Sequence, residues 1–405
     1  MESTTEEKIE KLNELFPDAD DEFLLEVLTS CNGSIRQAVS LIDASVSQKY
    51  DQLHSTKRLK AKTQSTLTKL LSDSLTKPGI SHGPQKTRTP IALHTKDEVE
   101  STLAYCTYHK DVLPSEVANK ILELVMNDKS ARSNEFYLFG NKCTSNHKTR
   151  IYSCAEHRKA LTYNGRVVDD VGEYTDEMMV AHVLIEDLVN EVLQSRGTLP
   201  YQVKPGEWTS QMAVANVYKL DSNLQWHSDR LTNIGPQAIV ASLSLGFSRE
   251  FRVRNIYPSD SQVYSIKPEH NSLLIMHAGF QEEYKHCVPP VPKCSRVPKD
   301  EFHPISGTTR VNITYRNRIM KKTPSCTKCG YPMELRRTFK KPDNRGMYMW
   351  QCSKSYTEEN GFKAGKECKG MRYANFNNDS VVTDDESNCS RWLADDDIQA
   401  REAQL

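Results

Sequence analysis

Hydrophobic residues recur at helical spacing near the start of the chain. The run "EEKIEKLNELFP" places Leu12 and Phe16 on one helical face and stops at Pro17. A second run of this kind, "DEFLLEVLTSCNG", ends on an Asn-Gly pair typical of a helix C-terminus, and "SIRQAVSLID" adds a third with Ser34 as N-cap. The pattern predicts a small three-helix bundle over residues 5–45.

The next segment, residues 46–101, loses this periodicity and is rich in Ser, Thr, Lys, Pro and Gly. Such composition predicts a disordered basic linker. Its stretch "QSTLTKLL" has the spacing of a sliding-clamp-binding peptide without the aromatic pair, and "KRLKAK" could serve nuclear import. The sequence leaves both functions of the linker open.

From Thr102 onward the pattern changes to long helices followed by short strands. "LPSEVANKILELVMND" and "TDEMMVAHVLIEDLVNEVLQSRG" are amphipathic, and the β-type runs are "AVANVY", "AIVASLSLG", "FRVRNI", "SLLIMHAG" and "RVNITYRNR". This order predicts a double-stranded β-helix (jelly roll) with flanking helices over residues 102–320. A cysteine-rich segment at 321–376 and a frayed acidic tail at 377–405 are expected to follow.

Charge adds a division that the net value hides. The 405 residues contain 53 Lys and Arg and 53 Asp and Glu, so the formal net charge is zero. Lys49 to Lys96 contains ten basic and two acidic residues, Lys321 to Arg372 thirteen and five, and Asn377 to Leu405 two and eight. The basic segments suit a partner with phosphates, although a solvated surface would look the same.

Localisation and redox state follow from what the chain does not contain. No apolar run reaches the length of a membrane span, and the start "MESTTEEKIEKLNELF" is acidic where a signal peptide is basic and then apolar. We therefore expect a nuclear protein, with the cytosol as the alternative, and no membrane partner. In either compartment the eleven cysteines are expected to be thiols or metal ligands.

His227 and Asp229 in "LQWHSD" have the His-x-Asp spacing of two of the three protein ligands in one type of iron(II) site. Two histidines and one carboxylate on one face leave positions free for a chelating co-substrate and oxygen. The third ligand must lie in "SLLIMHAGFQEEYKHCVPP", which offers His277 and His286. We favour His286, because it follows a turn and opens the next strand, but the sequence leaves His277 as an alternative.

An iron site of this type, with 2-oxoglutarate as its chelating co-substrate, also needs a cation that binds the distal carboxylate of 2-oxoglutarate. Arginine matches a carboxylate best. In a strand, "RVNITYR" directs Arg310, Asn312 and Arg316 to one face, and "NVY" does the same for Asn216 and Tyr218. Polar side chains inside a barrel need partners. The pattern therefore predicts that a ligand binds there.

Taken in order, "NVY", "WHSD", "IVASLSLGFSREFRVR", "SLLIMHAG…YKH" and "RVNITYR" resemble the AlkB family of Fe(II)- and 2-oxoglutarate-dependent dioxygenases, and most closely its branch acting on alkylated nucleic acid. The resemblance implies iron on His227, Asp229 and His286. It implies 2-oxoglutarate on Arg310 with help from Asn216, Tyr218 and Asn312, and the keto-acid end near Arg316.

The resemblance also implies a reaction, with oxygen and 2-oxoglutarate as co-substrates. The alkyl carbon on a base nitrogen is hydroxylated, and the product loses an aldehyde to restore the base. "HRKALTYNG" resembles the family's substrate lid, in which Arg158 and Tyr163 would meet a base extruded from its helix. One departure is the pair Arg230-Leu231, where relatives acting on DNA often have acidic residues. This departure leaves open both the choice of base and the nucleic-acid substrate itself.

The cysteine-rich segment has metal-ligand spacing. Cys326 and Cys329 are followed after twenty-two residues by Cys352 and after fifteen more by Cys368. Four thiolates in a reducing compartment predict a closed, structural zinc site. "DNRGMYMWQC" and "CKGMRY" resemble the GRF zinc finger, a family that generally binds single-stranded nucleic acid. The basic and aromatic residues expected to contact phosphates and bases are Arg336, Arg337, Lys340, Lys341, Arg345, Phe339, Tyr348 and Trp350.

At the other end, "LFP" and the pair Leu41-Ile42 resemble the CUE family of ubiquitin-binding domains. The resemblance implies that Phe16, Pro17, Leu41 and Ile42 bind ubiquitin. Together the predictions describe an enzyme that demethylates alkylated bases in DNA. The alternatives are an RNA demethylase of the same chemistry and a non-catalytic adaptor that binds ubiquitin and nucleic acid.

Overall fold

The computed structural model describes residues 89–138, 141–154, 162–163, 166–167, 170–258, 260–291, 297–320, 323–354 and 368–404, together with ten single residues between positions 8 and 39. The chain divides into two compact units. The first unit, mainly residues 1–89, contains helical and buried positions at Leu12, Leu24, Leu28 and Ala38. These positions agree with the predicted periodicity, and the three-helix bundle itself stays a prediction.

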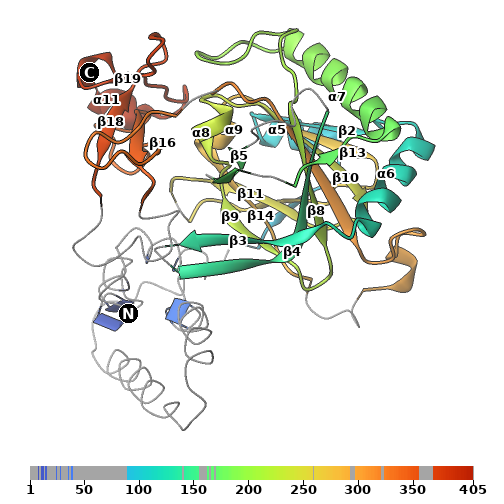
Figure 1. Cartoon of the computed structure of the whole chain (residues 1–405). Coiled ribbons are helices and arrows are strands. Elements are labelled where there is room, and N and C mark those ends of the chain that lie inside the picture. Colours follow the sequence, from blue (N-terminus) through green and yellow to red (C-terminus); the bar gives the residue numbers. More distant parts are fainter. Residues whose placement is uncertain are drawn as a thin grey trace. The chain divides into compact units, whose positions relative to one another are not determined.

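The second unit is built around two β-sheets (Figure 1). The larger sheet has the strand order β2-β13-β10-β15-β8-β4-β3, with β7 beside β4. Its strands are β2 (Cys106–Lys110), β3 (Arg132–Leu138), β4 (Asn141–Ser153), β7 (Gly172–Glu173), β8 (Met212–Tyr218), β10 (Val240–Gly246), β13 (Ser272–Met276) and β15 (Arg310–Arg316).

The smaller sheet has the order β1-β12-β11-β14-β9. Its strands are β1 (Ile91–Leu93), β9 (Leu224–His227), β11 (Phe251–Asn255), β12 (Tyr264–Ile266) and β14 (Tyr284–Val288), and a separate hairpin joins β5 (Thr162–Tyr163) to β6 (Arg166–Val167). Apolar side chains from both sheets, among them Val253 and Leu274, pack together in one core. The arrangement agrees with the predicted jelly-roll-like fold.

Helices cover the outer face of the larger sheet (Figure 1). The two long ones, α6 (Ser115–Asn127) and α7 (Asp176–Gln194), confirm the helices predicted from amphipathic spacing. Thr175 caps α7 by accepting a hydrogen bond from the Met178 N–H. Shorter helices are α5 (Lys96–Thr102), α8 (Leu231–Ile234), α9 (Phe280–Glu283) and the 3-10 turn η3 (Lys299–Glu301).

Alternation along the central strands separates a core face from a polar face. On β15, Val311, Ile313 and Tyr315 join the core beneath the helices. The intervening Arg310 and Asn312 therefore point to the opposite face, between the sheets. This confirms the predicted strand and the shared face of its polar residues.

The C-terminal part, named here the cysteine module, comprises residues 323–354 and 368–404. Its sheet joins β16 (Met333–Arg337), β17 (Tyr348–Cys352), β18 (Met371–Ala374) and β19 (Val382–Thr383), followed by the turn η4 (Glu386–Asn388) and the helix α11 (Ile398–Ala403). The expectation of a frayed tail at 377–405 is wrong for the described residues. Trp392 is buried in the module core, and Asp397 pairs with the buried Arg345 at 2.8 Å.

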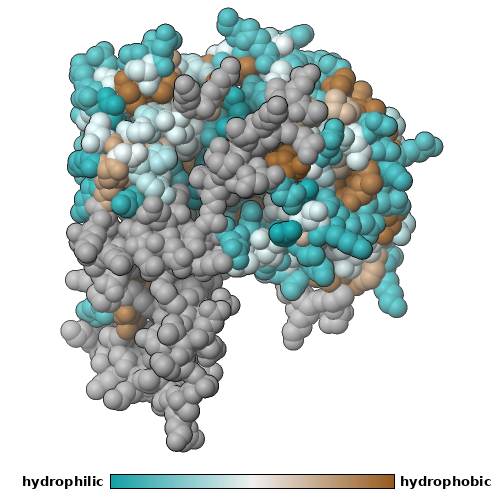
Figure 2. Space-filling model, in the orientation of Figure 1, coloured by the Kyte–Doolittle hydropathy of each residue, from teal (hydrophilic) through white to brown (hydrophobic). Residues whose placement is uncertain are grey.

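The surface on the face shown in Figure 2 is mainly hydrophilic, and its hydrophobic residues form small separate patches. Such scattered apolar residues are ordinary for a protein surface. Among the described helices, none has the length and apolar content needed to cross a membrane.

Candidate active site

Three predicted ligands meet where β9 pairs with β14. His227 ends β9 and lies opposite His286 in the antiparallel register, and Asp229 follows two residues after His227. One potential ligand atom from each residue lies within 4.8 Å of the others. The imidazole ring centroids of His227 and His286 are 4.2 Å apart. Strand pairing therefore brings together residues that are 59 positions apart in the chain.

Hydrogen bonds and charge prepare this cluster for a cation. His227 Nδ1 lies 2.8 Å from the Gln225 carbonyl, so it is a donor and leaves Nε2 as the basic nitrogen. Burial lowers the pKa of His286 to about 3, which keeps its imidazole neutral. Burial alone would raise the pKa of Asp229, but the Arg316 guanidinium at 2.8 Å and the two imidazoles hold it well below its usual range. Two neutral imidazoles and a carboxylate form a donor set that fits Fe(II).

The alternative ligand His277 lies elsewhere. It follows β13 of the larger sheet, and its Nε2 is 2.9 Å from the hydroxyl of Thr107. Its backbone N–H donates to the carbonyl of Tyr105. Among the described residues, the metal-type cluster contains His286 and not His277. The geometry thus favours the preferred histidine over the alternative.

The predicted co-substrate residues share the polar face of β15 and β8. The register places Arg310 opposite Tyr218 and Asn312 opposite Asn216. Arg310 is 1% exposed, and its guanidinium lies 5.6 Å from the centre of the Tyr218 ring and donates to Ser244 Oγ at 2.9 Å. Burial lowers its pKa to about 10.

Within the described part of the chain, Arg310 has no carboxylate within ion-pair distance, and its Nε has no hydrogen-bond partner. A buried cation without a counter-charge is costly. The site therefore has an unmet need for an anion with the geometry of a carboxylate.

Asn312 and Asn216 differ from the expectation that a ligand must satisfy them. The Asn312 amide donates to Ser242 Oγ at 2.8 Å and to the Leu243 carbonyl at 3.0 Å. Asn216 Oδ1 accepts from the hydroxyl of Thr149 at 2.8 Å. The protein itself pairs these amides, so Arg310 is the residue that most clearly indicates a ligand.

Several neighbours were not anticipated from sequence. Ser242 and Ser244 line the same face from β10, and their alternation in "SLSLG" was the signal that could have identified them. His147 stacks on Tyr218 with ring centroids 4.9 Å apart. Gln281 Oε1 accepts the backbone N–H of Asp229 at 2.7 Å. No local motif marks these last two residues, because only the tertiary fold brings them to the site.

The four predicted cysteines also converge. Cys326, Cys329, Cys352 and Cys368 each offer a sulfur within 4.8 Å of the others, and two of the Sγ–Sγ distances are 3.5 Å. Burial alone would raise the pKa of Cys326, but the backbone N–H groups of Lys328 and Cys329 outweigh it and lower the pKa to about 7. The cluster has the composition of a closed tetrahedral site.

The remaining predicted residues cannot be placed in the same way. Phe16, Pro17, Leu41, Ile42 and the lid residue Arg158 lie outside the described residues. Tyr163 belongs to the β5–β6 hairpin, where its backbone pairs with Arg166.

Residues 105–316 match the family model described as the 2OG-Fe(II) oxygenase superfamily. The chain is similar to the Homo sapiens protein named alpha-ketoglutarate-dependent dioxygenase alkB homolog 3, with 29% identity over 143 residues, 33% of this chain and 42% of that protein. The Bos taurus protein of the same name is 34% identical over 111 residues, 25% of this chain and 35% of that protein. The similarity thus spans less than half of the length of these relatives.

Solved structures are similar at low sequence identity. The structure titled OsALKBH1 has 15% identity and a TM-score of 0.38, covering 53% of this chain and 98% of that one. A prolyl-4-hydroxylase from Pseudomonas putida has 11% identity and a TM-score of 0.35, covering 54% of this chain and 95% of that one.

The family match includes both strands that hold the histidines of the cluster and the strand that holds Arg310. It supports the predicted enzyme class, a 2-oxoglutarate-dependent dioxygenase. Because the match covers more than half of the residues, the chain belongs to the 2OG-Fe(II) oxygenase superfamily.

Proposed function

We propose that this protein removes alkyl groups from bases in DNA by Fe(II)- and 2-oxoglutarate-dependent oxidation. The observation that most supports the chemistry is the buried Arg310 without a carboxylate partner among the described residues, on the strand β15 whose Arg316 pairs with Asp229 of the His227–Asp229–His286 cluster. The sequence resemblance to the AlkB branch that acts on alkylated nucleic acid supports this substrate class, and the similarity to proteins named alkB homolog 3 agrees with that resemblance.

His227, Asp229 and His286 would hold the iron, since they supply two neutral imidazoles and one carboxylate. Arg316 donates from Nε to Asp229 Oδ2 at 2.8 Å, so it fixes the carboxylate and lies next to where the keto-acid end of 2-oxoglutarate would bind. Arg310 would pair with the distal carboxylate through its planar fork. Asn312 and Asn216 orient the surrounding strands through their own hydrogen bonds.

Bound iron and oxygen would supply the oxidising power. One oxygen atom of O2 ends in succinate, with release of CO2 from 2-oxoglutarate, and the other ends on the alkyl carbon. The C–N bond of the hydroxylated carbon then breaks with its electron pair left on the base nitrogen, and the carbon leaves as an aldehyde as its hydroxyl group gives up a proton. The residues of this chain orient both co-substrate and base and exclude water. The β5–β6 hairpin, with Tyr163, is the proposed lid over an extruded base.

This function predicts that the purified protein with Fe(II), ascorbate and 2-oxoglutarate releases formaldehyde from a DNA oligonucleotide containing an N-methylated base. A matched RNA oligonucleotide of the same sequence is assayed in parallel, and an unmethylated one is the control. Faster release from DNA is expected. Preference for RNA would move the proposal to an RNA demethylase, and release from neither would favour the non-catalytic adaptor.

We propose a structural zinc ion for the four cysteines. Gly370 lies against the cluster, and a Cβ at this position would overlap Cys326 Sγ and lie 3.4 Å from Cys368 Sγ. Gly370→Ala should therefore displace a thiolate and lower the zinc content well below the expected value of about one ion per chain. Elemental analysis after gel filtration measures this, with Lys369→Ala as the neighbouring exposed control. An unchanged zinc content in Gly370→Ala would contradict the assignment.

Fewer residues of the cysteine module are accessible to nucleic acid than the sequence predicted. Arg337 and Arg345 have buried side chains in ion pairs with Glu283 and Asp397, and Tyr348 and Trp350 are fully buried. These residues are unavailable for phosphates or bases, which corrects that expectation. Lys340 and Lys341 are exposed and are the proposed phosphate contacts.

Ubiquitin binding by the N-terminal unit and a nuclear location remain proposals from the sequence. Both fit a repair enzyme that is recruited to modified chromatin, and neither is needed for the chemistry of the iron site. The proposed clamp and import roles of residues 46–101 have the same status.

A further inference from the structure

One strand of the cysteine module contacts both barrel segments next to the proposed metal site. The strand is β16, and the two segments are α8, which begins two residues after Asp229, and α9, which ends three residues before His286. A cysteine module whose only role was to bind nucleic acid would not need to contact α8 and α9.

The first contact involves the residues directly after Asp229. Arg230 donates to Glu334 Oε1 at 3.1 Å, and Thr232 Oγ1 accepts the backbone N–H of Leu335 at 3.2 Å. Leu231 is 7% exposed and belongs to the apolar core of the module. The pair Arg230-Leu231, which departs from the pattern of the resembling family, thus belongs to this interface.

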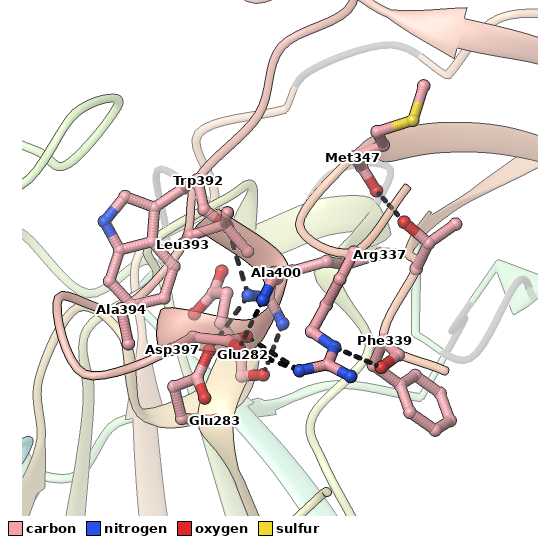
Figure 3. Close-up of polar contacts among 12 residues, drawn as sticks. Glu282, Glu283, Arg337, Phe339, Met347, Trp392, Leu393, Ala394, Asp397 and Ala400 are labelled. Atoms are coloured by element: carbon pink, nitrogen blue, oxygen red, sulfur yellow. Dashed lines mark hydrogen bonds and ion pairs between the residues drawn. The ribbon is translucent and has the colours of Figure 1, made fainter. Parts of the chain in front are cut away.

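The second contact is a buried polar network at α9 (Figure 3). Arg337 reaches out of the module and donates to the Glu282 carbonyl at 2.7 Å, to Glu283 Oε1 at 2.9 Å and to the Trp392 carbonyl at 3.1 Å. The Tyr348 hydroxyl donates to Glu282 Oε1 at 3.2 Å. Glu282 Oε1 also accepts the backbone N–H of Gln237 in the barrel at 2.8 Å, so this network joins the cysteine module to the barrel.

This network continues to the metal ligands. Gln281, in the same short helix α9, accepts the backbone N–H of Asp229 through Oε1 at 2.7 Å. Ser228 donates to the carbonyl of Tyr284, where β14 begins, at 2.8 Å. The position of the Asp229 backbone therefore depends on α9, and the position of α9 depends on Arg337.

We propose that the cysteine module positions Asp229 for metal binding, with Arg337 and Glu334 as positioning residues; this inference rests on the proposed iron site. Arg337 and Glu334 have side-chain exposures of 6% and 8%. Buried charged networks fix a geometry because each unpaired member would be costly. The module is then a permanent part of the catalytic unit and not a mobile attachment.

Manganese(II) is a suitable probe, because it prefers nitrogen and oxygen donors to the thiolates of the cysteine cluster. Free manganese is measured by electron paramagnetic resonance during titration of the full-length protein. Arg337→Met should weaken manganese binding about tenfold, as is typical when a residue behind a metal ligand is removed. Arg372→Met is the matched control, since Arg372 pairs with the exposed Asp384 inside the module at 2.8 Å. It should bind manganese as the wild type does.

A second readout separates positioning from a general loss of structure. At saturating manganese, Arg337→Met should keep its affinity for 2-oxoglutarate within about twofold, because Arg310 lies on β15, whereas the hydrogen bonds of Arg337 go to α9 and Trp392. The double variant Arg337→Met with Gln281→Met should bind manganese no more weakly than Gln281→Met alone, because both changes act on the same support. If Arg337→Met does not unfold cooperatively, Glu334→Gln takes its place, with weaker manganese binding expected.

The outcomes distinguish the two proposals. Wild-type manganese affinity in the Arg337→Met and Glu334→Gln proteins, with tight binding by the wild type, would overturn this inference and leave the proposed function standing. An equal loss of manganese and 2-oxoglutarate affinity would also overturn it, since that result indicates general damage. Absence of manganese binding by the wild type would overturn the iron site, and the inference with it.

Discussion

Replacing Asp229 with alanine is expected to weaken binding of Fe(II), or of manganese(II) as its stand-in, by about 1,000-fold or more and to abolish turnover. Two opposite unit charges about 4 Å apart interact by about 4 kcal/mol at an effective dielectric constant of 20, which is about 1,000-fold in affinity. The cation would also meet Arg316 without its carboxylate, since the two are 2.8 Å apart in the intact site.

The measurement is metal affinity together with succinate production. Because Asp229 also pairs with Arg316, the alanine variant should be less stable, so Asp229→Asn is compared to keep the side-chain volume. Both variants should lose the metal, and both must unfold cooperatively for the comparison to hold. Asp300→Ala removes an exposed carboxylate from η3 and should change neither quantity. Metal affinity retained in Asp229→Asn would contradict the ligand assignment.

Replacing Arg310 with methionine should weaken 2-oxoglutarate binding by about 100-fold while leaving manganese affinity unchanged. Removing one partner of a buried, charge-assisted pair costs about 3 kcal/mol, which corresponds to roughly 100-fold. The apo protein should not become less stable, because the guanidinium is buried with no carboxylate partner among the described residues. Loss of 2-oxoglutarate binding without loss of stability would indicate that Arg310 binds the ligand and does not support the fold.

Arg249 offers a matched control for this result. It is also 1% exposed, but its guanidinium donates to the carbonyls of Lys219, Ser222 and Pro289 at 2.6, 2.8 and 2.6 Å. Arg249→Met should therefore destabilise the protein, because it leaves these carbonyls unpaired. Calorimetry of both metal-free variants and titration with 2-oxoglutarate test the contrast. Destabilisation by Arg310→Met with normal co-substrate affinity would contradict the assigned role of Arg310.

The strands that hold the site could be predicted because their pattern is strict. In "RVNITYR", three apolar residues alternate with four polar ones, so a single strand fixes both the core face and the polar face. The same alternation marks "SLSLG" in β10, whereas β8, "MAVANVY", was predictable from its β-type apolar composition. The strand β4 gives no such signal in "NKCTSNHKTRIYS", since it is mainly polar and is held by pairing with β3 and β8.

The roles of the basic residues in the cysteine module could not be predicted. Arg337 and Arg345 look like phosphate contacts in sequence, but their acidic partners Glu283 and Asp397 are more than fifty positions away. A sequence motif shows the charge of an arginine, but it does not show an acidic partner that is distant in the sequence. For the same reason, the acidic composition of residues 377–404 led to the prediction of a frayed tail, although Trp392 in this segment is buried.

Sequence and structure together connect two metal-type clusters through one strand. The cluster of His227, Asp229 and His286 lies on the barrel, and the four cysteines lie in the module. Between them, β16 contacts α8 through Leu335 and α9 through Arg337. In the positioning role proposed above, the C-terminal module would support metal binding in addition to any contact with nucleic acid.

The most direct test of the proposed site is a crystal structure of the protein with manganese(II) and 2-oxoglutarate, prepared without oxygen, with the metal located by its anomalous scattering. We expect one manganese ion bound by His227, Asp229 and His286, and the distal carboxylate of 2-oxoglutarate paired with Arg310. Manganese bound instead beside His277, or 2-oxoglutarate bound away from Arg310, would contradict it.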